Sequence, residues 1–93
     1  MQRIVINVRH GGFGLSDVAQ ARYQELVGTP FPEYDWEAPR DCEYLVQTVQ
    51  ELGEKANGPH ARLKIVEVPD GVDWTVMEYD GMEWVAEAHR TWS

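Results

Sequence analysis

Apolar and polar positions alternate near the start of the chain. In the run RIVINVR, residues 3–9, one side of the alternation is apolar throughout (Ile4, Ile6 and Val8), and Val5 is apolar on the other side. A period of two is typical of a β-strand, and apolar residues on both sides indicate a strand that is mostly buried. The sequence therefore predicts a buried first strand.

Two helices are predicted in the first half of the chain. The first lies in SDVAQARYQELVG, residues 16–28, where Ser16 is placed as the N-cap and Gly28 as the C-terminal stop. Its helically spaced positions are Val18, Ala21, Arg22, Glu25 and Leu26. The second runs from about Asp41 to Leu52 and ends before Gly53, with Leu45, Val46, Val49 and Leu52 on one face.

The segment between these helices, TPFPEYDWEAPR at residues 29–40, contains three prolines and cannot form regular structure. We interpret it as an ordered loop anchored by Phe31, Tyr34 and Trp36.

The carboxy-terminal half changes to alternating runs separated by Asp-Gly pairs. The runs cover residues 63–68, 72–79 and 82–92, and the pairs lie at 70–71 and 80–81. Asp-Gly is a strong hairpin signal because a type I′ turn requires a positive φ at both central residues. We predict a three-stranded meander in which Trp74 and Trp84 belong to the core and face the helices. The last run also has the spacing of a short amphipathic helix, but the preceding turn favours a strand.

These elements give the order β-α-α-β-β-β. The predicted fold is a single α+β domain over residues 1–93, with a mainly antiparallel sheet and two helices packed on one face. Ninety-three residues support only a modest core, which favours a homo-oligomer.

The charge is strongly acidic and unevenly distributed. Sixteen Asp and Glu oppose eight Lys and Arg, for a net charge of −8, and residues 1–30 alone are slightly basic. Such a surface repels nucleic acid, so direct nucleic-acid binding is not expected. No apolar run approaches a membrane span and the start does not resemble a signal peptide, so the expected location is cytoplasmic.

A glycine-rich stretch between the first strand and the first helix is the main candidate site. Its residues are Arg9, His10, Gly11, Gly12, Phe13, Gly14 and, at the helix N-cap, Ser16. Backbone N–H groups at such a turn converge on an anion, and the helix dipole adds partial positive charge. The stretch matches neither a P-loop nor a dinucleotide fingerprint. The structural alternative is a tight turn with Phe13 packed into the core.

A second polar cluster lies near the carboxy terminus, where His89, Arg90 and Trp92 provide a titratable ring, a cation and a stacking surface. Arg and Trp planes stack well on a purine base. The alternative is an edge strand in which Arg90 pairs with a neighbouring glutamate.

Catalytic and metal-binding patterns are absent from the sequence. His10, His60 and His89 lie in separate elements without metal-ligand spacing, and Cys42 is the single cysteine. We expect a protein that is not an enzyme and that uses no cofactor.

Three segments carry a family resemblance: RIVINVRHGGFGLSDVA, ELGEKANGPHARLKIVEVPDGVDW and EYDGMEWVAEAHRTW. They resemble a group of small phage, prophage and bacterial proteins. That group is similar to the viral anti-defence sponges that oppose Thoeris immunity by sequestering cyclic ADP-ribose isomers. The resemblance implies a protein that binds a small phosphorylated nucleotide in the bacterial host without cleaving it.

Two other functions remain open from the sequence. The first is an acidic inhibitor or nucleic-acid mimic that binds a host defence protein through Glu33, Asp35, Glu37, Asp41 and Glu43. The second is a small phosphodiesterase.

Overall fold

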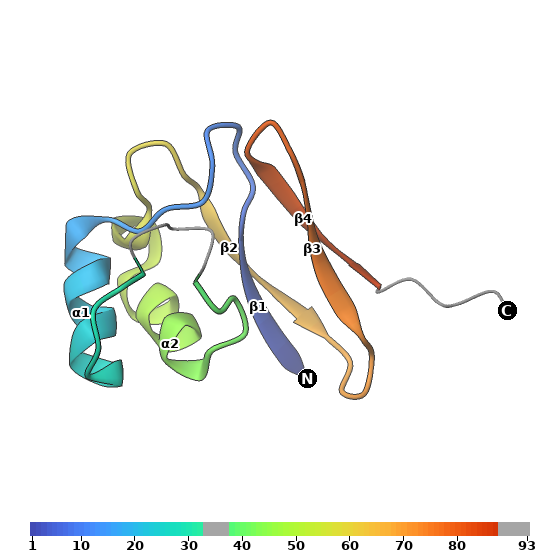
Figure 1. Cartoon of the computed structure of the whole chain (residues 1–93), viewed down its shortest axis with the longest axis horizontal. Coiled ribbons are helices and arrows are strands. Elements are labelled where there is room, and N and C mark those ends of the chain that lie inside the picture. Colours follow the sequence, from blue (N-terminus) through green and yellow to red (C-terminus); the bar gives the residue numbers. More distant parts are fainter. Residues whose placement is uncertain (33–37, 88–93) are drawn as a thin grey trace, which may run out of the picture.

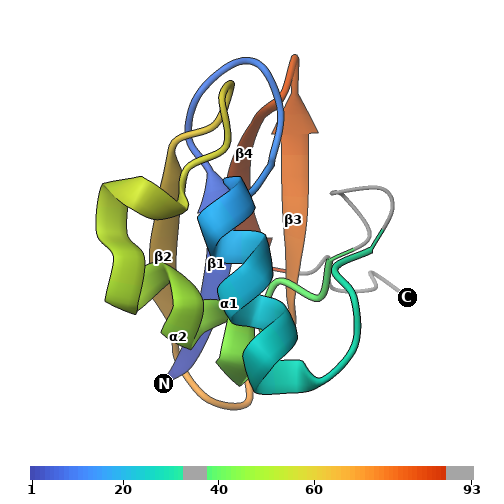
Figure 2. The same cartoon turned by 90° about the vertical axis from the view of Figure 1, so that its left-hand side faces the viewer.

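A two-stranded ribbon forms the middle layer of the molecule, as the computed structural model shows for residues 1–32 and 38–87. It pairs β1 (Gln2–Asn7) with β2 (Leu63–Val68) in antiparallel orientation. The helices α1 (Asp17–Val27) and α2 (Glu43–Leu52) cover one face, and a 3-10 turn, η2 (Gly53–Ala56), follows α2. A hairpin of β3 (Trp74–Tyr79) and β4 (Met82–Glu87) covers the other face (Figures 1 and 2). The α+β class and the order β-α-α-β-β-β are confirmed.

The first strand is apolar on both sides because both faces of the ribbon are covered. Val5 packs into the helix-side core, whereas Ile4 and Ile6 pack into a second core beneath the hairpin. All three side chains are almost completely buried. The predicted buried strand is confirmed, and the three-layer arrangement explains it.

The first helix begins and ends as its sequence predicts. The Ser16 hydroxyl accepts a hydrogen bond from the Ala19 N–H at 3.2 Å, and Gly28 is left-handed with φ 86°. The buried face differs from the expected one, however. Ala19 and Tyr23 are buried, whereas Val18 is 60% exposed.

The loop after α1 is anchored by an aromatic contact. The rings of Tyr23 and Phe31 meet edge to face with centroids 5.5 Å apart, and both side chains are buried. Burial raises the pKa of the Tyr23 phenol. Phe31 is therefore confirmed as an anchor, while Tyr34 and Trp36 lie outside the described residues.

The second helix begins at Glu43, two residues later than predicted. Leu45, Val46 and Val49 are buried as expected, and Leu52 is half-buried against the same core. Gly53 ends α2 after Leu52 as predicted, because its φ of 57° and ψ of −129° lie outside the helical region, and the separate 3-10 turn follows to Ala56.

The two Asp-Gly turns have different structures. Asp80 and Gly81 both have positive φ, 52° and 89°, and they join the paired strands β3 and β4 as predicted. The predicted meander is wrong, because the turn at Asp70 and Gly71 connects two separate sheets. Val66 and Trp74, on either side of that turn, pack into one core, so the layers stack instead of pairing edge to edge.

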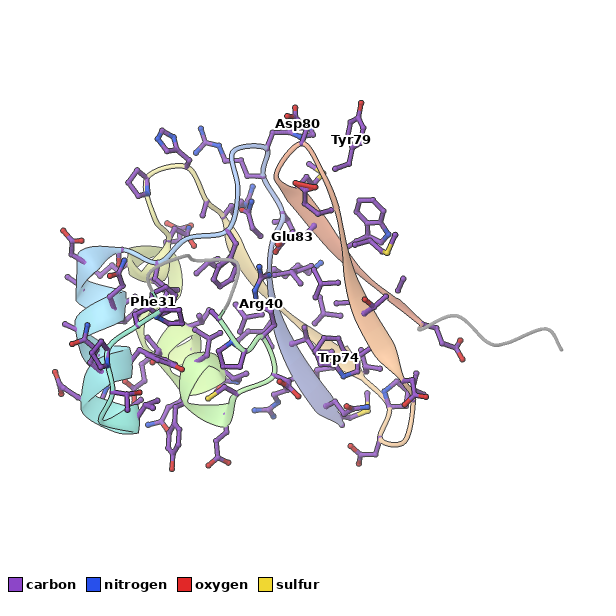
Figure 3. The ribbon with its side chains drawn as sticks, viewed as in Figure 1. Phe31, Arg40, Trp74, Tyr79, Asp80 and Glu83 are labelled. Atoms are coloured by element: carbon purple, nitrogen blue, oxygen red, sulfur yellow. The ribbon has the colours of Figure 1, made fainter. Side chains whose placement is uncertain are left out.

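The two hairpin tryptophans also differ from the prediction. Trp74 packs beneath the hairpin, where its Nε1–H donates to the Gln2 Oε1 at 3.0 Å (Figure 3). It contacts the face of the ribbon opposite the helices. Trp84 is 45% exposed, so its placement in the core was wrong. β4 instead turns Glu83 and Val85 inward.

A salt bridge joins the exposed sides of the two helices and permits a pH test. The Arg22 guanidinium donates to both Glu51 oxygens at 2.8 and 3.1 Å, and Gln47 donates at 3.0 Å. These hydrogen bonds, that of Arg22 foremost, lower the Glu51 pKa from 4.5 to about 2. Folding thus favours the charged carboxylate, so its contribution is present above pH 4.5 and is lost as the pH falls toward 2.

We expect the NMR signal of the Glu51 carboxyl carbon to titrate with a midpoint at a pH well below that of an ordinary glutamate. In an Arg22→Ala variant, the midpoint should rise toward the ordinary range. An unchanged midpoint in that variant would show that Arg22 is not the cause.

Candidate functional site

The glycine-rich stretch lies where three backbone segments meet at contact distance. Gly11 and Gly12 have φ values of 130° and 103°, which favour glycine. A Cβ on Gly11 would lie 2.6 Å from the His60 carbonyl oxygen, and a Cβ on Gly81 would lie 2.4 Å from the Gly12 nitrogen. The turn of the β3–β4 hairpin therefore packs directly against the Gly11 and Gly12 backbone.

The rest of the stretch is engaged in the same way. A Cβ on Gly58 would lie 2.9 Å from the Gly14 carbonyl carbon, and the Gly58 N–H donates to the Gly14 oxygen at 3.0 Å. The Ser16 hydroxyl donates to the Lys55 carbonyl at 2.6 Å, and the Ser16 N–H donates to the Ala56 carbonyl at 2.9 Å. Close packing and helix capping thus account for these residues, and their role in ligand binding stays a prediction.

Phe13 lies beneath a buried ion pair that sequence reasoning missed. The Arg40 Cζ lies 3.8 Å from the Phe13 ring centroid, a cation–π distance. The same guanidinium donates to the two Glu83 oxygens at 2.6 and 2.9 Å (Figure 3). Arg40 is 9% exposed and Glu83 is 7% exposed. Phe13 therefore belongs to the core, as the structural alternative for the turn proposed.

The Arg40 backbone carbonyl and the Glu83 carboxylate also accept hydrogen bonds from the edge of β1 that does not pair with β2. The Val5 N–H donates to the Arg40 carbonyl at 2.8 Å, and the Asn7 N–H donates to a Glu83 oxygen at 2.9 Å. Both are buried backbone donors that need an acceptor. Arg40 and Glu83 thus cover the open edge of the strand.

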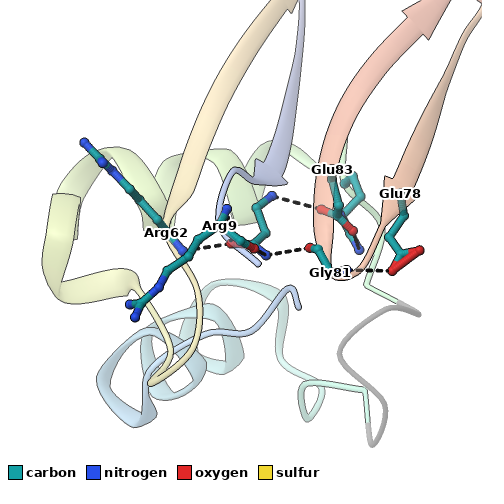
Figure 4. Close-up of polar contacts among 7 residues, drawn as sticks. Arg9, Arg62, Glu78, Gly81 and Glu83 are labelled. Atoms are coloured by element: carbon teal, nitrogen blue, oxygen red, sulfur yellow. Dashed lines mark hydrogen bonds and ion pairs between the residues drawn. The ribbon is translucent and has the colours of Figure 1, made fainter. Parts of the chain in front are cut away.

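Asn7 connects the strand end to both neighbouring segments, and it too was missed. Its Oδ1 accepts from the Arg62 N–H at 2.8 Å and from the Arg9 N–H at 3.3 Å. Its Nδ2 donates to the Arg9 carbonyl at 2.6 Å and to the Gly81 carbonyl at 2.7 Å (Figure 4). The side chain is fully buried. It therefore fixes the backbone of Arg9 and Arg62 with respect to the hairpin.

Those two arginines line an open pocket of about 610 Å³ at the end of the β1–β2 ribbon. The remaining lining residues are Gly53, Glu54, Asn57, Ala61 and Leu63. Arg9 and Arg62 are exposed, and within the described part of the chain neither forms an ion pair. Their side chains leave the ribbon on the same side and spread apart (Figure 4). Two guanidinium groups are thus available to an anionic ligand.

His10 lies beside the hairpin turn. Its Nδ1 is 3.2 Å from the Asp80 carbonyl oxygen and 3.8 Å from the Asp80 carboxylate. Its side chain is 57% exposed. Among the predicted site residues, the structure therefore places Arg9 in the pocket and His10 at the hairpin turn.

The other predicted groups lie partly beyond the described residues. His89, Arg90 and Trp92 are all outside them, as are Glu33, Asp35 and Glu37 of the acidic alternative. Asp41 and Glu43 are exposed and line a second open pocket of about 550 Å³ with Arg3, at the opposite end of β1 from Arg9.

Within residues 1–32 and 38–87, no cluster of three or more His, Cys, Asp or Glu side chains is arranged to hold a metal ion. No helix in those ranges has the length and apolar character needed to cross a membrane. No protein-family model, curated protein or solved structure matches the chain.

Proposed function

We propose that the protein binds a small phosphorylated ligand in the pocket between Arg9 and Arg62 and sequesters it. The observation that carries this proposal is the pair of exposed guanidinium groups without ion-pair partners among the described residues. Arginine binds phosphate oxygens through two parallel hydrogen bonds, which a lysine ammonium cannot form. A diphosphate offers oxygens to both groups.

The position of the two arginines distinguishes them from the other cations. Arg22 and Arg40 form ion pairs, and Arg3, which forms none among the described residues, lines the other pocket, so Arg9 and Arg62 are the two unpaired arginines that share one pocket there. Glu54 also lines the pocket, and its charge disfavours a ligand that carries only phosphate. A ligand with neutral hydroxyl groups and a base beside the phosphates suits this mixed lining better.

The size of the pocket supports a nucleotide. Its volume of about 610 Å³ lies within the usual range of small-molecule sites. The family resemblance points to a cyclic ADP-ribose isomer as the ligand and to anti-defence sequestration as the purpose. Sequestration requires tight binding and no chemical step, so the function we propose is not enzymatic.

Isothermal titration calorimetry with ADP-ribose, a cyclic ADP-ribose isomer and inorganic pyrophosphate tests this proposal. A charge-assisted hydrogen bond contributes about 1.5–3 kcal/mol, so Arg9→Ala and Arg62→Ala should each weaken binding about ten- to hundredfold. Arg3→Ala is the matched control, because it removes an equal charge at the other end of β1. It should leave the affinity nearly unchanged.

Two results would refute the proposal. One is equal affinity in the wild type and in a folded Arg9→Ala, Arg62→Ala double variant. The other is conversion of the nucleotide, detected by chromatography after incubation, because sequestration leaves the ligand intact.

A further inference from the structure

The outer side of the β3–β4 hairpin carries a continuous row of large apolar side chains. Val76 and Val85 pack inward against the ribbon, so alternation turns Met77, Tyr79 and Trp84 outward. The strand register pairs Met77 with Trp84 and Tyr79 with Met82. We call these four residues, Met77, Tyr79, Met82 and Trp84, the hairpin outer face.

This face is exposed to an extent that packing among the described residues, 1–32 and 38–87, does not explain. Met77 is 44% exposed, Tyr79 is 72% exposed and Trp84 is 45% exposed. Tyr79 projects from the hairpin away from the β1–β2 ribbon (Figure 3). The other large exposed apolar residues of the described chain are scattered, with Met1 ahead of β1, Val18 on α1 and Tyr44 on α2. A contiguous exposed apolar row of this kind marks an interaction surface.

The charge around the face determines the kind of partner. Residues 72–87 contain five acidic side chains and no Lys or Arg. Asp73 and Asp80, at the two ends of the outward-facing row of β3, are exposed and form an acidic border. Glu78 lies opposite Glu83 on the inward side of the hairpin, where Arg40 neutralises Glu83. A second copy would bring the same acidic border and its own net charge of −8. Nucleic acid would bring phosphates. The acidic border therefore repels a second copy of the chain and nucleic acid, and it attracts a cationic partner.

We propose that the hairpin outer face docks a protein partner that presents apolar side chains flanked by lysine or arginine. The aromatic and methionine side chains supply the apolar contact area, as they do at the centre of protein interfaces. The acidic border accelerates association and selects the charge of the partner. This surface is separate from the Arg9 and Arg62 pocket, so the proposal does not depend on the proposed function.

Peptide titration tests the proposal with the intact chain. The probe is a short synthetic peptide in which leucine and lysine alternate, and two further peptides replace every leucine by serine or every lysine by glutamate. We expect only the leucine–lysine peptide to bind. Its amide chemical-shift changes in the protein should concentrate on residues 75–86, and binding should weaken at high salt.

Variants that preserve the charge provide the matched comparison. Trp84→Ser and Tyr79→Ser should each weaken peptide binding roughly tenfold, because aromatic residues dominate interface energies. Val18→Ser removes an exposed apolar side chain from α1 and should change nothing. Tyr79 is more exposed than Met77 and Trp84, so Tyr79→Ser disturbs the packing of the fold least. It keeps the test valid if Trp84→Ser fails to fold.

Three outcomes would overturn the proposal. The first is equal binding of the leucine–lysine and serine–lysine peptides, which would mean charge attraction alone. The second is unchanged binding by folded Trp84→Ser and Tyr79→Ser variants. The third is a dimer in analytical ultracentrifugation that Tyr79→Ser dissociates, because the face would then be covered by a second copy.

Discussion

Replacing Glu83 by glutamine is expected to destabilise the protein by about 3–5 kcal/mol, because it leaves the buried Arg40 guanidinium without a compensating charge. Both side chains of this pair are more than nine-tenths buried, and the two hydrogen bonds are short. A domain of this size is stable by only about 5–14 kcal/mol, so the loss is a large fraction. Urea unfolding monitored by circular dichroism measures it directly.

The chain contains a matched control for this prediction. Arg22 and Glu51 form a pair of the same type, with two hydrogen bonds, on the exposed side of the helices. Water and salt screen that pair, so Glu51→Gln should lower the free energy of unfolding by much less than Glu83→Gln does. Equal effects of Glu83→Gln and Glu51→Gln would show that burial does not determine the loss.

A double variant separates the lost attraction from the stranded charge. Arg40→Met removes the cation and keeps an apolar side chain over Phe13, while the glutamine at position 83 can still accept from the Asn7 N–H. Burying neutral groups of similar volume avoids the desolvation penalty, so the double variant should recover most of the stability. No recovery would mean that the ion pair itself, and not the unpaired charge, accounts for the effect.

Features set by neighbouring residues could be predicted from the sequence. The cap at Ser16, the stop at Gly28 and the type I′ turn at Asp80 and Gly81 each depend on a few adjacent positions. The alternation with apolar residues on both sides correctly predicted a mostly buried strand.

The orientation of β4 could not be predicted in this way. Its alternation permits either Trp84 or Glu83 to face inward, and hydrophobicity favours the tryptophan. The structure turns Glu83 inward because Arg40, 43 positions earlier, neutralises it there. A register change of one residue reverses every side chain of a strand, so this single distant pair determines which face of the hairpin is apolar and exposed.

In the candidate site, too, features set by adjacent residues could be predicted and those set by distant residues could not. The glycine-rich stretch was recognisable as unusual, and Arg9 was named from its position beside it. Arg62 was not, because only the pairing of β1 with β2 brings it next to Arg9. Asn7 was read as one more position in a strand, although its four side-chain hydrogen bonds join segments up to 74 residues apart.

Asn7→Ala is expected to lower both the stability of the fold and the affinity of the proposed pocket. Four hydrogen bonds are lost, two of which hold the backbone N–H groups of Arg9 and Arg62. At about 1 kcal/mol for each bond, the loss of stability should be about 3–4 kcal/mol. Asn57→Ala is the control, because its side chain lies in the same pocket and accepts a single bond, from the Leu63 N–H at 2.8 Å.

The effect on binding distinguishes a positioning role from a purely structural one. In the folded Asn7→Ala variant, Arg9 and Arg62 keep their charges but lose the acceptor that fixes them relative to each other. We therefore expect inorganic pyrophosphate to bind about tenfold more weakly to Asn7→Ala than to Asn57→Ala, measured by calorimetry where both variants are folded. If the two variants bound pyrophosphate equally while Asn7→Ala remained less stable, Asn7 would have a structural role only. The two arginines would then bind the ligand without being positioned by Asn7.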